Sequence, residues 1–193
     1  MKTLTLNGSL RKEVGKKASK NIRKQDAVPC VLYGGAEVIH FQINNSELRN
    51  LIHTPNIYLV DLNIEGKKIT SILKEAQFHP VKDEILHADF LEVFPDKPIT
   101  ISIPVVLEGL SEGVKAGGKL SLEKRKLKVR GLYKNIPEKL VVNIENLGLG
   151  KTIQIGRLSF DQLELLDAKN AVVCAVKLTR AARGAAAAAA EGK

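Results

Sequence analysis

Two short segments of the chain carry side chains that could bind a polyanion and contact its bases. Residues 11–23 form a stretch that is rich in Lys and Arg. Residues 77–90 contain two histidines, a glutamine and two aspartates within a few positions of one another. Recognition of RNA needs both kinds of group, cations to hold phosphates and polar groups to reach base edges. Together the two segments predict an RNA-binding surface.

The basic segment combines cations with small residues. Lysines supply point charges, and arginines supply planar forks that bind one phosphate through two hydrogen bonds. The cations of this segment are Arg11, Lys16, Lys17, Lys20 and Arg23. Gly15 permits a close backbone approach to a ligand, and Ser19 offers a small hydroxyl donor. The alternative interpretation is a solvated loop that only keeps the protein soluble.

The polar residues of the second segment are spaced as on a strand. Because residues two apart on a strand point to the same side, Ile85, His87 and Asp89 should share one face. The positions between them are apolar and should face the core. Gln77 and His79 are also two apart and could share a face. The sequence therefore predicts a strand face that presents an imidazole and a carboxylate to solvent or to a ligand.

Asp89 is unexpected on a basic surface, and its role has two interpretations. A carboxylate suits RNA if it accepts hydrogen bonds from a 2′-hydroxyl or from a base amino group, such as that of guanine in the minor groove. Otherwise Asp89 only orients His87 or pairs with a nearby lysine. Tyr33, at the end of an apolar run, is similarly open: it could stack on or hydrogen-bond to RNA, or close the core.

Enzyme chemistry has little support in the sequence. The chain lacks a Gly-x-Ser-x-Gly elbow and a phosphate loop that ends in Gly-Lys-Ser/Thr. The four histidines lack metal-ligand spacing, and the two cysteines form no Cys-x-x-Cys pair. We therefore expect no catalytic residue, no metal and no cofactor. A small hydrolase or nuclease that uses His87 and Asp89 is kept as an alternative.

The charge is unevenly distributed along the 193 residues, whose formal net charge is +9. Residues 1–24 hold eight Lys or Arg and one Glu, whereas residues 25–93 hold five Lys or Arg and ten Asp or Glu. A cationic edge of this kind fits a nucleic-acid partner. Cys30 and Cys174 lie in apolar runs and indicate a reducing compartment. The polar N-terminus and the absence of a long apolar run predict a cytoplasmic protein without membrane contact.

Short apolar segments separated by turn residues predict a mainly β fold with short helices. In the first part of the chain the expected strands are residues 3–6, 28–33, 38–43, 58–64, 68–73, 75–81 and 85–93. A polar loop is expected over residues 7–17, with short helices over residues 18–25 and between the capping residues 44–47 and Pro55. So many strands with two short helices predict a small β-barrel.

Two prolines within residues 94–98 predict a domain boundary, because they block a helix and interrupt a strand ladder. We expect an RNA-binding β-barrel domain over residues 1–93, a β-rich domain over residues 94–180 and a flexible Ala-rich tail over residues 181–193. In the second domain the expected strands are residues 99–107, 120–129, 140–144, 152–155 and 171–178. Residues 113–118 should form a loop, and residues 159–165 one turn of helix.

The second domain carries a basic strand of its own. Residues 119–134 hold seven Lys or Arg and one Glu. By alternation Lys124, Lys126, Lys128 and Arg130 should share one face, with Arg125 and two apolar residues on the other. This face could contact RNA or protein, or it could simply be solvated.

The ordered motifs resemble a known family. They are Arg11…Gly15-Lys16…Ser19…Arg23, then Val28-Pro29-Cys30-Val31-Leu32-Tyr33-Gly34, then Gln77-Phe78-His79-Pro80, then His87-Ala88-Asp89-Phe90. Over residues 2–93 they resemble the bacterial ribosomal proteins of the L-twenty-five family, which bind 5S ribosomal RNA (rRNA). The remainder resembles the long form of that family, the general stress protein CTC type, in its loop at residues 113–120 and its turn at residues 135–138.

The resemblance implies a β-barrel that docks on the minor-groove side of loop E of 5S rRNA, in the central protuberance of the large ribosomal subunit. It implies RNA contacts at Arg11, Lys16 or Lys17, Ser19, Lys20, Arg23, Tyr33, Gln77, His79, His87 and Asp89. Asp89 then takes the role of acceptor for a base amine. The second domain could contact neighbouring ribosomal proteins or rRNA. The alternative within the same class is a stress-response RNA-binding protein that acts free of the ribosome.

Overall fold

The computed structural model describes residues 1–180, which pack as two mainly β units. Unit 1 comprises residues 1–99 and 132–134, and unit 2 comprises the remaining described residues. A closed barrel in the first unit and two further sheets in the second confirm the predicted fold class. The tail predicted for residues 181–193 lies outside the described residues.

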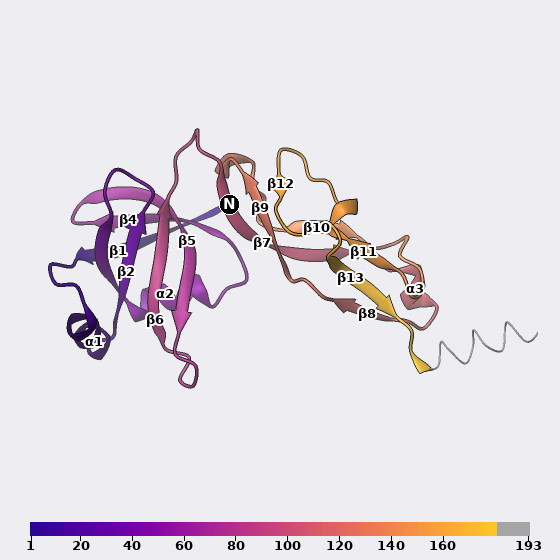
Figure 1. The fold of residues 1–193 in the computed structure, drawn as a ribbon, viewed down its shortest axis with the longest axis horizontal. Helices are drawn as coiled ribbons and strands as arrows, with labels where there is room; N and C mark the ends of the chain where they lie inside the picture. Colours follow the sequence, from indigo (N-terminus) through magenta and orange to yellow (C-terminus); the bar gives the residue numbers. More distant parts are fainter. Residues whose placement is uncertain (181–193) are drawn as a thin grey trace, which may run out of the picture. The chain divides into compact units, whose positions relative to one another are not determined.

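Unit 1 is a closed barrel of six strands (Figure 1). The strands are β1 (Lys2–Leu10), β2 (Ala27–Tyr33), β3 (Ile39–Asn44), β4 (Tyr58–Ile64), β5 (Lys67–Phe78) and β6 (Ile85–Glu92). They pair in the order β1-β3-β2-β6-β5-β4, and β1 closes the barrel by pairing in parallel with β4. Closure satisfies both edges of the sheet, so the barrel offers a rigid outer surface.

The barrel interior is apolar, as strand alternation requires. Phe41 on β3 and Phe90 on β6 are completely buried, and their ring centroids lie 5.7 Å apart. A Cβ at Gly8 of β1 would come within 2.8 Å of Phe41 Cδ2, so glycine leaves the room that this ring needs. Cys30 and Ala88 fill the space between larger side chains and have no exposed surface.

Helix α2 (Asn45–Ile52) adds Leu48 and Leu51 to the barrel core. The helix begins where the capping residues of the sequence predict. Asn44 Oδ1 accepts hydrogen bonds from the backbone N of Ser46 at 3.1 Å and from its Oγ at 3.0 Å. The cap satisfies an amide that the first helical turn would leave without a partner.

Replacing Asn44 by alanine is expected to lower the free energy of unfolding by about 1 kcal/mol, the usual value of such a cap. Urea denaturation followed by circular dichroism would measure the change. Asn50→Ala is the matched control, since Asn50 is exposed within the same helix. Equal losses from the two substitutions would show that the cap contributes nothing.

Two strands of the barrel are longer than predicted. Residues 7–10, expected in a loop, continue β1 because they pair with β4 and β3. The segments 68–73 and 75–81 form one strand, β5, whose register against β6 shifts between Leu73 and Glu75. This bulge interrupts the alternation, so the sequence pattern was wrongly split into two strands.

Unit 2 contains a four-stranded sheet in the order β10-β7-β9-β12 and a three-stranded sheet in the order β11-β13-β8. Its strands are β7 (Ile99–Glu108), β8 (Lys119–Leu122), β9 (Lys126–Gly131), β10 (Leu140–Asn143), β11 (Thr152–Gln154), β12 (Glu164–Leu165) and β13 (Val172–Lys177). Its short helical turns are α3 (Glu112–Lys115) and η2 (Ile155–Arg157). A third turn, η1 (Tyr133–Asn135), begins in the segment 132–134 that belongs to unit 1.

Three predictions for unit 2 were wrong. The single strand expected over residues 120–129 is divided between β8 and β9, which belong to different sheets. The division occurs where the amides of Glu123 and Lys124 both donate to the carbonyl of Val173. The loop expected at residues 113–118 contains α3, which Ser111 caps. Residues 159–165 form a turn followed by β12 rather than helix.

Candidate nucleic-acid interface

Three of the predicted contact residues lie together on the outer surface of the barrel. The register of β5 against β6 places Gln77 opposite His87 and Glu75 opposite Asp89. Ala88, between His87 and Asp89, is completely buried, so the two polar side chains face outward. We call Gln77, His87 and Asp89 the polar face.

His87 and Asp89 are in direct contact within the polar face. His87 Nδ1 lies 2.6 Å from Asp89 Oδ1, and about a quarter to a third of each side chain is exposed. An imidazole that donates from Nδ1 to a carboxylate is held in one orientation, and its neutral form keeps Nε2 as an acceptor. Within residues 1–180, no other hydrogen bond to this carboxylate is found, so Asp89 Oδ2 is open to an incoming donor.

Two neighbouring predictions were wrong. Ile85 does not share the polar face but is buried in the barrel core, because the register of β5 against β6 shifts between Gln77 and Phe78. His79 does not share a strand face with Gln77, because β5 ends at Phe78. Instead, His79 Nδ1 accepts from the backbone amides of Val81 and Lys82, both at 3.2 Å. His79 thus holds the turn between β5 and β6.

Tyr33 ends β2, the strand beside β6, and is half-buried. Burial raises the pKa of its hydroxyl, and the negative charges of Asp89 and Glu75 raise it further. The phenol therefore remains protonated at neutral pH and keeps a hydrogen-bond donor next to the polar face.

Four of the five predicted cations, all except Arg11, lie on helix α1 (Lys16–Lys24), whose N-cap is Gly15 with φ +116°. The side chains of Lys16, Lys17 and Lys20 are exposed. The helix has no side-chain cap and no acidic residue in its first turn. Its first amides and the positive end of its dipole therefore point toward solvent next to the lysines, an arrangement that favours an anion. We call Lys16, Lys17 and Lys20 the lysine cluster.

Arg23 links α1 to the strand that carries the polar face. Its Nε donates to the carbonyl oxygen of Leu86 at 3.0 Å, one residue before His87. The guanidinium is exposed and keeps further N–H groups, so it can still donate to a phosphate. This bond brings the end of the cationic helix next to the start of the polar face.

Arg11 and Ser19, both predicted contacts, bind to each other. Arg11 Nη2 donates to Ser19 Oγ at 3.2 Å and to the carbonyl of Glu13 at 3.4 Å. Its Nε is enclosed and has no hydrogen-bond partner among residues 1–180. As placed, Arg11 holds the loop that leads into α1, and this positioning role was missed in the sequence.

Two further polar residues, Glu75 and His40, extend the outer surface and were also missed. Glu75 lies opposite Asp89, and Val31 pairs with both Asp89 and His40, so one row of outward positions crosses β5, β6, β2 and β3. His40 is exposed at the far end of this row. Strand alternation indicated that His40 faces outward, but only the pairing register places it in line with Asp89.

Catalytic and metal chemistry gain no positive support. Burial raises the pKa of the Cys30 thiol to about 12, so the thiol stays protonated at neutral pH and is a poor nucleophile. Within residues 1–180, no hydroxyl or thiol hydrogen-bonds to His87, and no group of three potential metal ligands occurs. The same residues contain no helix that is long and apolar enough to cross a membrane.

The basic strand of unit 2 matches its predicted alternation only in part. Lys126, Lys128 and Arg130 on β9 are exposed, while Leu127 and Val129 are completely buried. Two flanking residues depart from the pattern, since Lys124 forms an ion pair with Asp167 at 2.6 Å and Arg125 is exposed. Both precede the first residue of β9, so strand alternation does not apply to them.

Comparison with known proteins matches both units to family models. Residues 6–90 match the Ribosomal L25p family, and residues 98–180 match the C-terminal domain of ribosomal protein TL5. Large ribosomal subunit protein bL25 of Bacteroides thetaiotaomicron is 60% identical, covering 98% of this chain and 99% of its own length. The protein of the same name from Bacteroides fragilis is 65% identical, covering 90% of this chain and 88% of its own length. That from Porphyromonas gingivalis is 60% identical, covering 96% of this chain and 98% of its own length.

Proposed function

The chain belongs to the Ribosomal L25p family, in the long form with a TL5-type C-terminal domain, and on that premise we propose that it is a structural component of the large ribosomal subunit that binds 5S rRNA. Its place of action is the ribosome in the bacterial cytoplasm. The barrel and α1 supply the contact with 5S rRNA, at loop E in the central protuberance.

One observation carries this proposal: the cationic helix and the polar face are joined by the bond from Arg23 Nε to the Leu86 carbonyl. A duplex that lies across the barrel at this point meets both sets of groups at once. The lysine cluster and the α1 amides hold phosphates, which fixes the position of the RNA without reading its sequence.

The polar face then lies against the groove. Asp89 accepts from a base amine or a 2′-hydroxyl, His87 accepts through Nε2, and Gln77 and Tyr33 supply further donors. Two carboxylates, Asp89 and Glu75, lie side by side here and repel phosphates. The positive charge of the lysine cluster thus suits the phosphates of the RNA backbone. The negative charge at the polar face suits hydrogen-bond donors of the bases and riboses.

Unit 2 makes a second contact within the subunit, with rRNA or a neighbouring ribosomal protein. The exposed cations of β9, Lys126, Lys128 and Arg130, supply charge for such a contact.

Sedimentation of a bacterial lysate in a sucrose gradient tests the ribosomal role. We expect the chain to sediment with large subunits and to copurify with 5S rRNA when subunits are dissociated at high salt. A chain that stays at the top of the gradient while still binding RNA would instead support the stress-response alternative.

The hydrolase alternative has its own test. Purified chain incubated with 5S rRNA should leave the RNA intact over hours. Cleavage that is present in the wild type and absent in His87→Ala would overturn the structural role in favour of a nuclease.

A further inference from the structure

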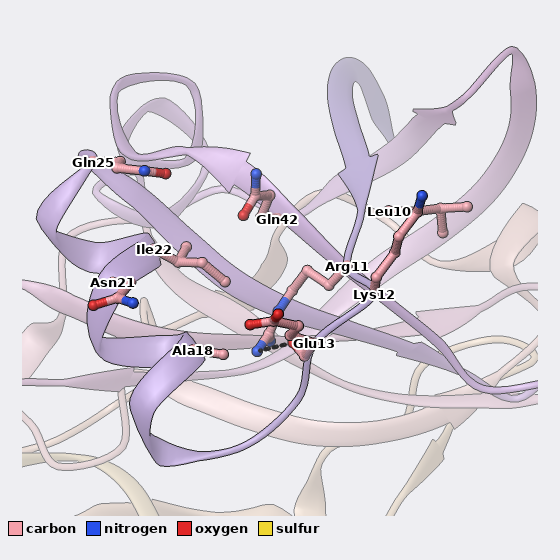
Figure 2. A pocket seen from close by; sticks show the side chains of 9 residues that line it. All are labelled: Leu10, Arg11, Lys12, Glu13, Ala18, Asn21, Ile22, Gln25 and Gln42. Carbon is pink, nitrogen blue, oxygen red and sulfur yellow. Dashed lines mark hydrogen bonds between the residues drawn. The ribbon is translucent and has the colours of Figure 1, made fainter.

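A pocket of about 250 Å³ lies between α1 and strands β1 and β3 (Figure 2). Apolar side chains form part of its wall, and carboxamides form another part. The apolar ones are Leu10, Ala18 and Ile22, and the carboxamides are Asn21, Gln25 and Gln42. Figure 2 shows the α1 side chains and Gln42 around one opening.

The pocket exists because α1 is not packed tightly on the barrel. Ala18, Asn21, Ile22 and Gln25 are spaced three and four residues apart and line the pocket from one side of the helix. No residue of α1 is buried, although an apolar helix face normally packs against a core. The barrel side of this helix therefore keeps accessible surface.

The carboxamides of the pocket are chemically unused. Within residues 1–180, the side chains of Asn21, Gln25 and Gln42 make no hydrogen bond to another protein group. Each carboxamide offers two donors and an acceptor with two lone pairs. Amides from a helix and a strand around one apolar patch suit a flat heterocycle with polar edges.

The size and the charge of the pocket narrow the ligand further. The volume lies below the roughly 300–1,000 Å³ of sites for drug-sized ligands, so a fragment such as one nucleobase is appropriate. Asn and Gln pair with adenine through its N6 and N7, whereas guanine prefers an arginine fork. Arg11 lines the pocket, but Ser19 and the Glu13 carbonyl hold its Nη2 and its Nε is enclosed. Arg11 Nη1 makes neither of these bonds and Lys12 also lines the pocket, so the choice of adenine over guanine rests on the three carboxamides, and the test includes guanosine positions.

We propose that this pocket receives one unpaired adenine base of the bound RNA, with Gln42, Asn21 and Gln25 on its polar edges and Ile22, Leu10 and Ala18 against its faces. The inference rests on the proposed 5S rRNA binding and adds a site of base recognition to it. Extruding a base costs a few kcal/mol, and the cost is lowest for one that is already unpaired.

The test combines protein variants with single-atom changes in 5S rRNA. Each unpaired adenosine is replaced in turn by purine riboside, which lacks the 6-amino group, and affinity is measured by filter binding with the full chain. We expect one position at which the replacement weakens wild-type binding by about tenfold, as for one lost bidentate pair. Gln42→Ala should weaken binding of unmodified 5S rRNA to a similar degree. In this variant, purine riboside at that position should cause no further loss of affinity.

Two more variants complete the design. Ala18→Leu should fill the pocket and weaken binding without removing any charge. Gln154→Ala is the matched control, since Gln154 is a half-exposed strand glutamine of unit 2 without a side-chain cap bond. It should change the affinity by less than about twofold. Thermal unfolding of each variant verifies that the barrel remains folded.

The possible failures are distinguishable. If the wild type binds 5S rRNA but no adenosine position couples to Gln42, the pocket does not hold an adenine and the inference is overturned. Coupling at a guanosine or a pyrimidine position in a parallel scan would overturn the choice of base. If the wild type binds 5S rRNA no better than an unrelated duplex, the proposed function itself fails.

Discussion

Replacing Lys16, Lys17 and Lys20 together by alanine should lower the affinity for 5S rRNA by roughly a hundredfold near 0.1 M salt. Each lysine that neutralises a phosphate releases condensed counterions, and each loss should reduce the slope of log affinity against log salt by about one. The triple variant should therefore lose most affinity at low salt and differ least from the wild type at high salt. Filter binding across a salt series measures both quantities.

The control for this experiment must remove the same charge from elsewhere on unit 1. Lys2, Lys67 and Lys68 are exposed on β1 and β5, and their replacement by alanine lowers the net charge equally. If both triple variants lose the same affinity, the binding depends on overall charge alone and α1 is not the phosphate-binding element.

The barrel could be predicted from the sequence because its strands alternate cleanly. Phe41 and Ile43 on β3, for example, are buried, whereas His40, the residue before Phe41 on the same strand, is exposed. The pattern failed where a register shift interrupts alternation, as at Leu73 and Glu75 on β5. A bulge adds one residue to one strand only. The sequence of a single strand does not indicate which residue of the neighbouring strand each of its residues pairs with.

The candidate site was predicted in composition but not in arrangement. His87 and Asp89 share a face as the spacing requires, whereas Ile85 turns into the core because the register shifts near it. Arg11 and Ser19 were predicted to face RNA, yet they hydrogen-bond to each other across eight positions of the chain. Spacing along a strand determines which residues share a side, but contacts between a loop and a helix depend on tertiary packing.

The contact between Asp89 and His87 makes the two interpretations of the aspartate separable by one isosteric change. Asp89→Asn keeps an oxygen that can accept from His87 Nδ1, so a purely orienting role would be nearly unaffected. If the second oxygen of Asp89 accepts from a base amine, asparagine puts its own NH2 group at that place. The NH2 group of the side chain and the amine of the base would then face each other as two donors without an acceptor. We therefore expect Asp89→Asn to reduce the preference for 5S rRNA over a plain duplex by about 1–3 kcal/mol, roughly tenfold or more.

The preference is the quantity to measure, because removing one negative charge raises the affinity for any RNA. Asp61→Asn is the matched control: Asp61 is a half-exposed carboxylate on β4 whose Oδ1 accepts from Thr70 Oγ1 at 3.1 Å. It should raise binding to both RNAs slightly and leave their ratio unchanged. A ratio for Asp89→Asn that matches this control would mean that Asp89 only holds His87 in place. Recognition would then have to come from His87 Nε2, Gln77 and the helix, without an acceptor for a base amine.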